Sequence, residues 1–360
     1  INHTMKDSAT NRFRAECENV YYNPWFQQAP QWNTYALIGS CLHNGLDIFN
    51  MRPQAFISNT KDLYPLYFFN QYAGQKNPAT AKGAFCILRD VLNVNDTKRF
   101  PESKYGKVLT LSPSDIDRME TRAKDLPDEL QKSARMRIYA QNVSKDRVQA
   151  ILKEFEKYGA REDDLESISS GNTTDFSNRT GRQKNQQMTG LKKAQAQGNM
   201  ENFTPDKLNN DLGFDLIPDN YFQYLIQYAP NTTSRGYWRK GPKDQPFGRF
   251  ARGFDHSNGM NEMLFALDNR FFSGSTAPQT VQVKVTYFDE GNGEWSLNYY
   301  DGAGKKKAYS IQCKGSGQWI TKSVTISDFY CKQQLDHNCD LSLRYIAGDN
   351  TIFSTVEVLR

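Results

Sequence analysis

Charged and amide side chains follow two short apolar runs in the first hundred residues. The run LDIFNMR (46–52) ends with Asn50 and Arg52, and the run AFCILRD (84–90) ends with Arg89 and Asp90. In a (β/α) barrel, ligand-binding groups project from the C-terminal ends of the strands. Asp90 is then a candidate catalytic carboxylate, and Asn50, Arg52 and Arg89 are candidate substrate ligands. The forked guanidinium groups suit a carboxylate or sulfate group on a ligand.

A single carboxylate does not make a hydrolytic site. Cleavage of a glycosidic bond takes two carboxyl groups about 5 to 10 Å apart, and only Asp90 qualifies in this region. Asp90 is equally well explained as the partner of Arg89 in an ion pair or as a helix N-cap, and Arg52 and Arg89 as members of salt bridges. We therefore expect the catalytic carboxylates to lie mostly outside this chain.

A second candidate region is aromatic and basic. It contains Tyr237, Trp238 and Arg239, and then Arg249 and Arg252. Trp238 and the three arginines can stack on and hydrogen-bond a glycan. In the competing interpretation Trp238 fills one end of a sandwich, and the arginines pair with Asp244, Asp255 and Asp268, because buried arginines are normally paired.

Acidic turn residues offer oxygen ligands of the kind that Ca²⁺ prefers. The candidates are Asp289, Asp301 and Asp349, with Glu290 beside the first. None has the spacing of an EF-hand, and solvated turn residues are the ordinary explanation. Calcium is the one cofactor that the sequence allows us to consider.

The chain has six cysteines and no Cys or Cys/His cluster with the spacing of a zinc site. Cys331 and Cys339 flank a short polar loop between two strand-like runs, so we predict a disulfide between them. The sequon Asn-x-Ser/Thr occurs at Asn2, Asn95, Asn142, Asn172, Asn178, Asn202 and Asn231. These sequons make glycosylation of a secreted chain plausible. An Asn- and Thr-rich composition can also produce them without any glycan.

The elements that would position the first candidates alternate helix with strand. Helical patterns precede the apolar runs 46–52 and 84–90, and an α/β alternation of this kind implies parallel strands covered on both faces. Two strands do not make a stable parallel sheet. We therefore expect 1–112 to be the C-terminal part of a (β/α)8-type barrel that is completed by an upstream polypeptide.

Two further segments separate this part from the C-terminal region. Residues 113–160 are predicted to form a helical bridge. Its clearest helix is RVQAILKEFEKYG, where Val148, Ile151, Leu152 and Phe155 recur at helical spacing and Gly159 can end the helix. Residues 161–212 are rich in Ser, Asn, Thr, Gln, Gly and Lys and are predicted to be a polar linker.

The C-terminal segment 213–360 has the pattern of an antiparallel β-sandwich, jelly-roll-like in its order of short strands. TVQVKVTY (280–287) and EWSLNYY (294–300) alternate apolar with polar residues, as do MLFALD, SVTISDF, DLSLRYI and STVEVL. Turn signals separate the runs: EGNG, DGAGK, KGSG and AGDN. Six or more short strands without helices are typical of this fold.

Composition excludes several other classes. The chain of 360 residues is 38% hydrophobic and 24% charged, which is enough apolar material for about two packed domains. It has no apolar run of eighteen residues that would span a membrane. Its net charge of +5 is too small and dispersed to favour nucleic acid as a partner. No Gly-rich dinucleotide or phosphate-loop motif occurs.

Several blocks of sequence resemble a known architecture. GRFARGFDHSNGMNEMLFALDNRFF, VQVKVTYFDEGNGEWSLNYYDGAG and TIFSTVEVL resemble the β-sandwich at the end of secreted proteins with glycoside-hydrolase-like barrels. HNGLDIFNMR, FFNQYAGQKNP, AFCILRDVLN and DTKRFPESKYG resemble the last strands and helices of such a barrel. The resemblance implies a carbohydrate-active protein without supplying its acid and base.

The expected function is therefore that of the C-terminal portion of a secreted, glycoside-hydrolase-like protein that acts on or binds a polysaccharide. The alternative is a non-catalytic secreted glycoprotein of a cell-surface or matrix assembly, built on an enzyme-like scaffold. A free-standing lectin-like module is weaker, because residues 21–160 are not needed to bind a sugar.

Overall fold

The structure is a computed structural model that describes residues 64–75, 77–90, 92–94, 96–108, 145–160, 219–242 and 248–360, with short pieces at 14–16, 38–39, 41–43, 48–50 and 165–166. The chain forms two compact units. The first contains residues 1–90, 199–212 and 219–360, and the second contains residues 91–198 and 213–218.

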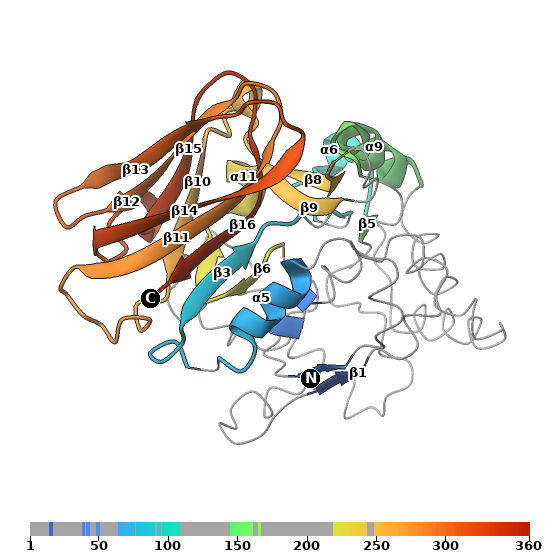
Figure 1. Cartoon of the computed structure of the whole chain (residues 1–360). Helices are drawn as coiled ribbons and strands as arrows, with labels where there is room; N and C mark the ends of the chain where they lie inside the picture. The colour runs from blue at the N-terminus through green and yellow to red at the C-terminus, as the bar shows by residue number, and fades with distance from the viewer. Residues whose placement is uncertain are drawn as a thin grey trace. The chain divides into compact units, whose positions relative to one another are not determined.

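Two antiparallel sheets dominate the first unit, and the predicted β-sandwich is confirmed (Figure 1). One sheet runs in the order β13 (Lys305–Gln312), β12 (Glu294–Tyr300), β15 (Leu341–Ala347), β10 (Glu262–Leu267) and β7 (Leu225–Gln227). The other runs in the order β14 (Gln318–Phe329), β11 (Gln279–Asp289), β16 (Ile352–Leu359), β3 (Gly83–Ile87) and β6 (Tyr221–Gln223). A further pair joins the second sheet, because β9 (Arg249–Gly253) pairs with both β16 and β8 (Arg235–Lys240).

The core lies between the sheets and follows from alternation along the strands. In β12, Trp295, Leu297 and Tyr299 belong to the main apolar cluster, and in β11 Val281 and Val283 join them from the opposite sheet. Burying one large apolar side chain contributes about 1.5 to 3 kcal/mol, so this shared cluster is what holds the two layers face to face.

Strand β3 corrects the expectation of a (β/α) barrel. Its five residues pair antiparallel with β16 on one side and β6 on the other, with Cys86 opposite Val356 and Phe222. The strand is buried on both faces because Phe85 packs against Phe68 and Tyr72 of helix α5 (Tyr64–Tyr72). A central sandwich strand under a helix shows the same continuous apolar run as a parallel strand, and the barrel interpretation was therefore wrong for this segment. The sandwich takes in residues well before 213.

The other run assigned to the barrel forms a very short strand. β2 (Ile48–Asn50) pairs in parallel with β1 (Arg14–Glu16) in a separate two-stranded sheet. Arg52 lies outside the described residues, as does most of the proposed linker 161–212.

The second unit contains the helix that the sequence predicted most clearly. α9 (Lys145–Phe155) is followed by a 3-10 turn, η2 (Glu156–Tyr158), and Gly159 ends it with a φ of 88°. Ile151 and Phe155 are buried. Nearby are α6 (Glu102–Tyr105) and the parallel pair β4 (Leu92–Asn93) and β5 (Leu165–Glu166). Across the described part of the chain, no helix is long and apolar enough to cross a membrane.

Candidate binding face

The outward face of the five-stranded sheet carries small polar side chains where a solvent-exposed sheet usually has long ones. Because Trp295, Leu297 and Leu343 point into the core, their neighbours Ser296, Asn298 and Ser342 point outward. These three residues, the polar floor, are nevertheless only 3%, 6% and 0% exposed. Asn298 lies opposite Ser342 in the register, and its amide donates to the hydroxyls of Ser296 at 3.2 Å and Ser342 at 3.3 Å.

An ion pair crosses above the polar floor. Lys305 on β13 pairs with Glu262 on β10, although β12 and β15 lie between them. Strands three places apart in a flat sheet are about 14 Å from each other. The two residues are also at different heights along the strands. Lys305 is level with Tyr300 of β12, whereas Glu262 is level with Arg344 of β15 and, through it, with Ser296 of β12. Two side chains do not span that diagonal over a flat surface, so the sheet curves and its outer face is concave.

Two cations on the same face have no ion-pair partner among the described residues. Arg344 is directly opposite Glu262 in the β10–β15 pairing, but its side chain is exposed and makes no ion pair with the residues that the structure describes. Lys307 is opposite Asn298, is exposed, and likewise has no carboxylate partner among the described residues. The polar face, meaning the polar floor with Glu262, Lys305, Lys307 and Arg344, thus combines buried hydroxyl and amide groups with available positive charge.

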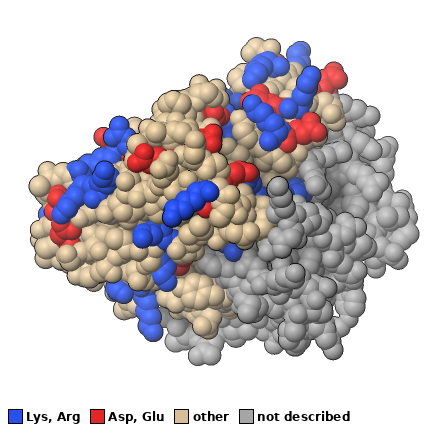
Figure 2. Space-filling view, turned by 45° about the horizontal axis from the view of Figure 1, so that its top comes forward, with Lys and Arg blue, Asp and Glu red and all other residues tan. Residues whose placement is uncertain are grey.

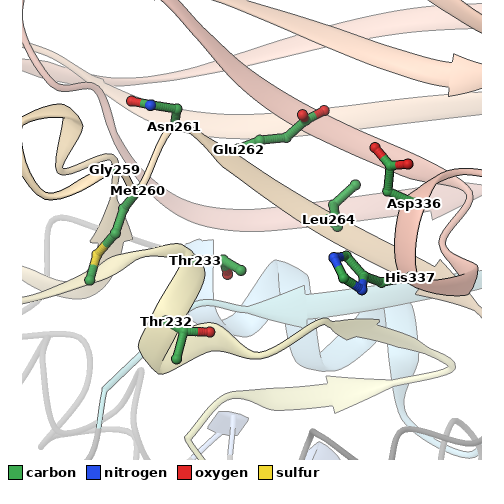
Figure 3. A pocket seen from close by; sticks show the side chains of 9 residues that line it. All are labelled: Thr232, Thr233, Gly259, Met260, Asn261, Glu262, Leu264, Asp336 and His337. Atoms are coloured by element: carbon green, nitrogen blue, oxygen red, sulfur yellow. The ribbon is translucent and has the colours of Figure 1, made fainter.

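A hollow of about 380 Å³ lies at the β10 side of this face. It is lined by Thr232, Thr233, Gly259, Met260, Asn261, Glu262, Leu264, Asp336 and His337 (Figure 3). Glu262 and Leu264 come from β10, the threonines from α11 (Pro230–Thr233), and the last two from η7 (Asp336–Asn338). Both α11 and η7 contact β10, so they form a wall beside the sheet.

Backbone conformation and ring stacking fix the residues that form this wall. His337 has a φ of 56°, and its ring stacks on Tyr228 with centroids 4.2 Å apart and planes 9° from parallel. The Nδ1 of His256 lies 2.8 Å from the amide oxygen of Asn261, which lines the hollow, and the His256 ring stacks on Tyr345. The ring of His337 is held in place in the wall, where it offers a flat face next to hydrogen-bonding groups.

A buried carboxylate supports the loop that carries η7. Asp340 accepts hydrogen bonds from the backbone amides of Gln333 at 2.6 Å and Leu267 at 2.9 Å. Burial raises the pKa of Asp340 to about 7, even though these amide hydrogen bonds act to lower it. The loop that positions Asp336 and His337 is therefore tied to the end of β10 through one side chain.

The residues proposed from the two apolar runs lie elsewhere. Asp90 is buried, and its carboxylate lies 3.3 Å from the guanidinium of Arg252, with both side chains fully enclosed. The guanidinium of Arg89 lies 4.6 Å from the ring centre of Tyr221. The alternative explanation for Asp90 was an ion pair with Arg89. The structure shows an ion pair, but its partner is Arg252. Asn50 ends β2, far from these residues in the sequence.

The aromatic and basic segment is mostly internal. Trp238 and Arg249 are buried, and the Arg249 guanidinium lies 5.5 Å from the ring centre of Trp319. Arg239 is half-buried, with a φ of 53°. The alternative of paired arginines holds for Arg252 but with other partners. Asp255 pairs with Arg235 at 2.9 Å, and Asp268 pairs with Arg270 at 2.9 Å; Asp244 lies outside the described residues.

Each of the three carboxylates proposed for calcium accepts hydrogen bonds from backbone amides, Asp301 within its own turn and the other two from a neighbouring turn. Asp289 accepts from the amides of Lys314 and Ser316, Asp301 from those of Ala303 and Gly304, and Asp349 from that of Asn292. Burial acts to raise the pKa of Asp289, but hydrogen bonds from Ser316 and from backbone amides outweigh it and leave the pKa below its usual value. In the described ranges no three His, Cys, Asp or Glu side chains gather as metal ligands.

The predicted disulfide is wrong. Cys331 and Cys339 are both free and buried, and burial raises the pKa of each thiol. Backbone hydrogen bonds between Leu335 and Cys339 close the loop instead. Of the predicted glycosylation sites, only Asn231 is described. Its amide nitrogen donates to Asp219 at 3.0 Å and its amide oxygen accepts from Arg252 at 2.9 Å.

Sequence reasoning missed the polar face. The signal was present in EWSLNYY and DLSLRYI, where the outward positions hold Ser, Asn and Ser rather than Lys, Glu or Thr. Small hydroxyl and amide residues at successive outward positions of neighbouring strands mark a face that something else covers. The strand order β12–β15, which the sequence does not state, is what brings them together.

Known proteins resemble this chain only distantly. No family model matches the chain, and no curated protein matches it. Among solved structures, the C-terminal carbohydrate-binding module (CBM6) of the marine laminarinase LamC from Zobellia galactanivorans is 10% identical, with a TM-score of 0.21, over 38% of this chain and 93% of that one. A carbohydrate-binding module of Cellvibrio mixtus lichenase 5A, solved with cellotriose, is 10% identical, with a TM-score of 0.19, over 36% and 88%. The Eiger TNF of S. frugiperda is 12% identical, with a TM-score of 0.18, over 38% and 90%.

Proposed function

We propose that this chain binds a polysaccharide on the polar face of its five-stranded sheet. The observation that carries the proposal is the polar floor, in which Ser296, Asn298 and Ser342 lie buried on the side of the sheet away from the core. Hydroxyl and amide side chains both donate and accept hydrogen bonds, and a sugar ring presents hydroxyls that do the same. The concave shape suits an extended chain lying across the strands.

The ion pair above the floor is weak enough to move aside. Lys305 and Glu262 are about one quarter to one third exposed, and pairs at this exposure typically stabilise a protein by about 0 to 1 kcal/mol. A ligand that replaces this pair with several hydrogen bonds gains more than it loses. The hollow beside Glu262, with the ring of His337 at its wall, extends the binding surface along the same edge.

The proposal is tested with the full chain against a panel of soluble polysaccharides, by affinity electrophoresis and calorimetry. We expect binding by at least one polymer and a loss of about 2- to 10-fold for Asn298→Ala, since one hydrogen bond is worth about 0.5 to 1.5 kcal/mol. Thr321→Ala is the matched control. Thr321 bonds Thr286 on the outer face of the other sheet, at 2.9 Å.

Thermal unfolding of each variant separates loss of binding from loss of fold. Equal effects of Asn298→Ala and Thr321→Ala would move the site away from the polar face. No binding across the panel would refute the function and leave association with other proteins of a surface assembly as the stronger alternative.

We further propose that the chain acts outside the cell, as the binding part of a carbohydrate-active protein. The support is the set of seven sequons. Intact mass of protein from its natural source, before and after glycosidase treatment, tests this. A mass equal to that of the bare polypeptide would remove the support.

A further inference from the structure

The charges of the polar face are arranged in an unusual way. In an antiparallel pair, residues directly opposite each other have Cβ atoms about 4.5 to 5.5 Å apart, so Arg344 is the natural partner of Glu262. Glu262 instead pairs with Lys305, which reaches it from three strands away. The carboxylate is thus neutralised by a distant cation, and the guanidinium next to it is left unpaired among the residues that the structure describes.

The surroundings of Arg344 supply further donors. Ser296 is opposite Arg344 on β12, and Ser342 is two residues earlier on the same face of β15. A guanidinium presents five N–H groups in a planar fork that fits two oxygens of a carboxylate or sulfate, and adjacent hydroxyls can donate to the remaining oxygens. Ile346, two residues further along this face, is 41% exposed and offers an apolar contact beside the charged group.

A second unpaired cation extends the pattern along the ligand. Lys307 is on β13, and β12, with Asn298 opposite Lys307, separates it from β15, the strand of Ser342 and Arg344. Two strand spacings and two residues place their Cα atoms about 12 Å apart in a regular sheet. Outward-pointing side chains at that separation can each hold a different acidic group of one polymer.

We propose that the polar face selects acidic polysaccharides, with Arg344 binding the anionic group of one sugar and Lys307 that of another. This inference rests on the proposed function and deepens it by naming the class of ligand. The shared chemistry is an oxyanion, a carboxylate or a sulfate, carried on a sugar polymer. In the structure Lys305 pairs with Glu262, which leaves Arg344 available to a ligand that approaches the face.

The test compares polymers that differ only in charge. Calorimetry with the full chain uses polygalacturonate, the same polymer after reduction of its carboxyl groups, carrageenan, and carrageenan after desulfation. We expect at least one acidic polymer to bind about 10-fold or more tightly than its neutral counterpart. Comparison of the uronate and sulfate arms shows which oxyanion is preferred.

The variants make the residue assignment specific. Arg344→Gln is expected to weaken binding of the acidic polymer about 10- to 100-fold, because charge-assisted hydrogen bonds are worth about 1.5 to 3 kcal/mol, and to weaken binding of the neutral polymer by a clearly smaller factor, since only uncharged hydrogen bonds are lost there. Lys322→Gln removes an exposed lysine from β14 on the other sheet and is the matched control. Arg344 is exposed, so its substitution leaves the core intact, and near-ultraviolet circular dichroism verifies this.

The outcomes separate the two proposals. Equal affinity for acidic and neutral polymers would overturn the inference and leave polysaccharide binding standing. Equal losses for Arg344→Gln and Lys322→Gln would mean that general charge attraction, not this site, holds the polymer. Failure of every polymer to bind would refute the proposed function and the inference together.

Discussion

Some single side chains stabilise this fold because they are completely buried and bond several elements at once. Arg252 is fully buried and pairs with Asp90, donates to the carbonyl oxygen of Pro230 at 2.8 Å and to the amide oxygen of Asn231 at 2.9 Å. It therefore links β9 to α11 and to the end of β3. A buried ion pair adds little net stability in general, but removing one partner leaves an uncompensated charge.

Replacement of Arg252 by methionine is accordingly expected to lower the free energy of unfolding by about 3 to 5 kcal/mol. Lys306→Met is the control. Lys306 pairs with Asp328 at an exposed site, where solvent screens the attraction and the loss of stability is small. Urea unfolding followed by tryptophan fluorescence measures both. An Arg252 variant as stable as the Lys306 variant would show that the buried network is not structural.

Asp340 predicts a dependence of stability on pH. Its folded pKa of about 7 is above the value of about 3.9 expected in the unfolded chain. Between these values the folded state binds more protons, so stability falls as pH rises from about 4 to about 7, by at most about 4 kcal/mol. The contribution is fully present below pH 4 and lost above pH 7.

The variant Asp340→Asn carries no titrating group and should lack this slope. Urea midpoints at pH 4, 5, 6, 7 and 8 for both proteins provide the measurement, with the difference between the two curves assigned to Asp340. Parallel curves over the whole range would contradict the raised pKa. The thiols of the neighbouring Cys331 and Cys339 do not contribute to the slope between pH 4 and pH 8, because burial raises their pKa values.

At the scale of elements, the sequence predicts the helices and strands whose pattern lies within the element itself, but not how distant strands pair. The alternation in β11, β12, β15 and β16 predicted strands, and the amphipathic spacing of α9 predicted a helix. For β3 the pattern GAFCI shows burial on both faces but not the direction of its neighbours. Antiparallel pairing with β16, some 270 residues later in the chain, is a property of the whole fold. The polar face was missed for the same reason, since Ser296 and Ser342 meet only through the β12–β15 register.

Strand β3 should therefore exchange its amide hydrogens as part of the sandwich. Hydrogen exchange with mass spectrometry is expected to show similar protection for peptides covering Gly83–Ile87 and Ile352–Leu359, because the central strands of a sheet open together. Fast exchange of the first peptide with slow exchange of the second would assign β3 to a separate, less stable structure.

At the scale of the whole molecule, charge is mixed rather than segregated. On the face that Figure 2 shows, Lys and Arg are interspersed with Asp and Glu among the described residues, in keeping with the small net charge of +5. A strong field of one sign would attract any polyanion without selection. The proposed recognition of an acidic ligand would instead depend on local unpaired groups such as Arg344, which is why single substitutions are informative.

The division into two units leads to the last prediction. In the second unit the buried Arg147 of α9 donates to the carbonyl oxygens of Phe100 at 2.7 Å, Gly106 at 2.8 Å and Val94. One side chain thus satisfies these three backbone acceptors of residues 94–106, with a longer contact of 3.5 Å to the carbonyl oxygen of Asp96, and methionine satisfies none of them. Arg147→Met should cost about 3 kcal/mol or more, since each buried acceptor without a partner costs about 1 to 3 kcal/mol. Because all three acceptors belong to the second unit, exchange should accelerate in Lys145–Phe155 while Gln279–Asp289 of the sandwich stays protected. Equal loss of protection in both segments would show that the two units unfold as one.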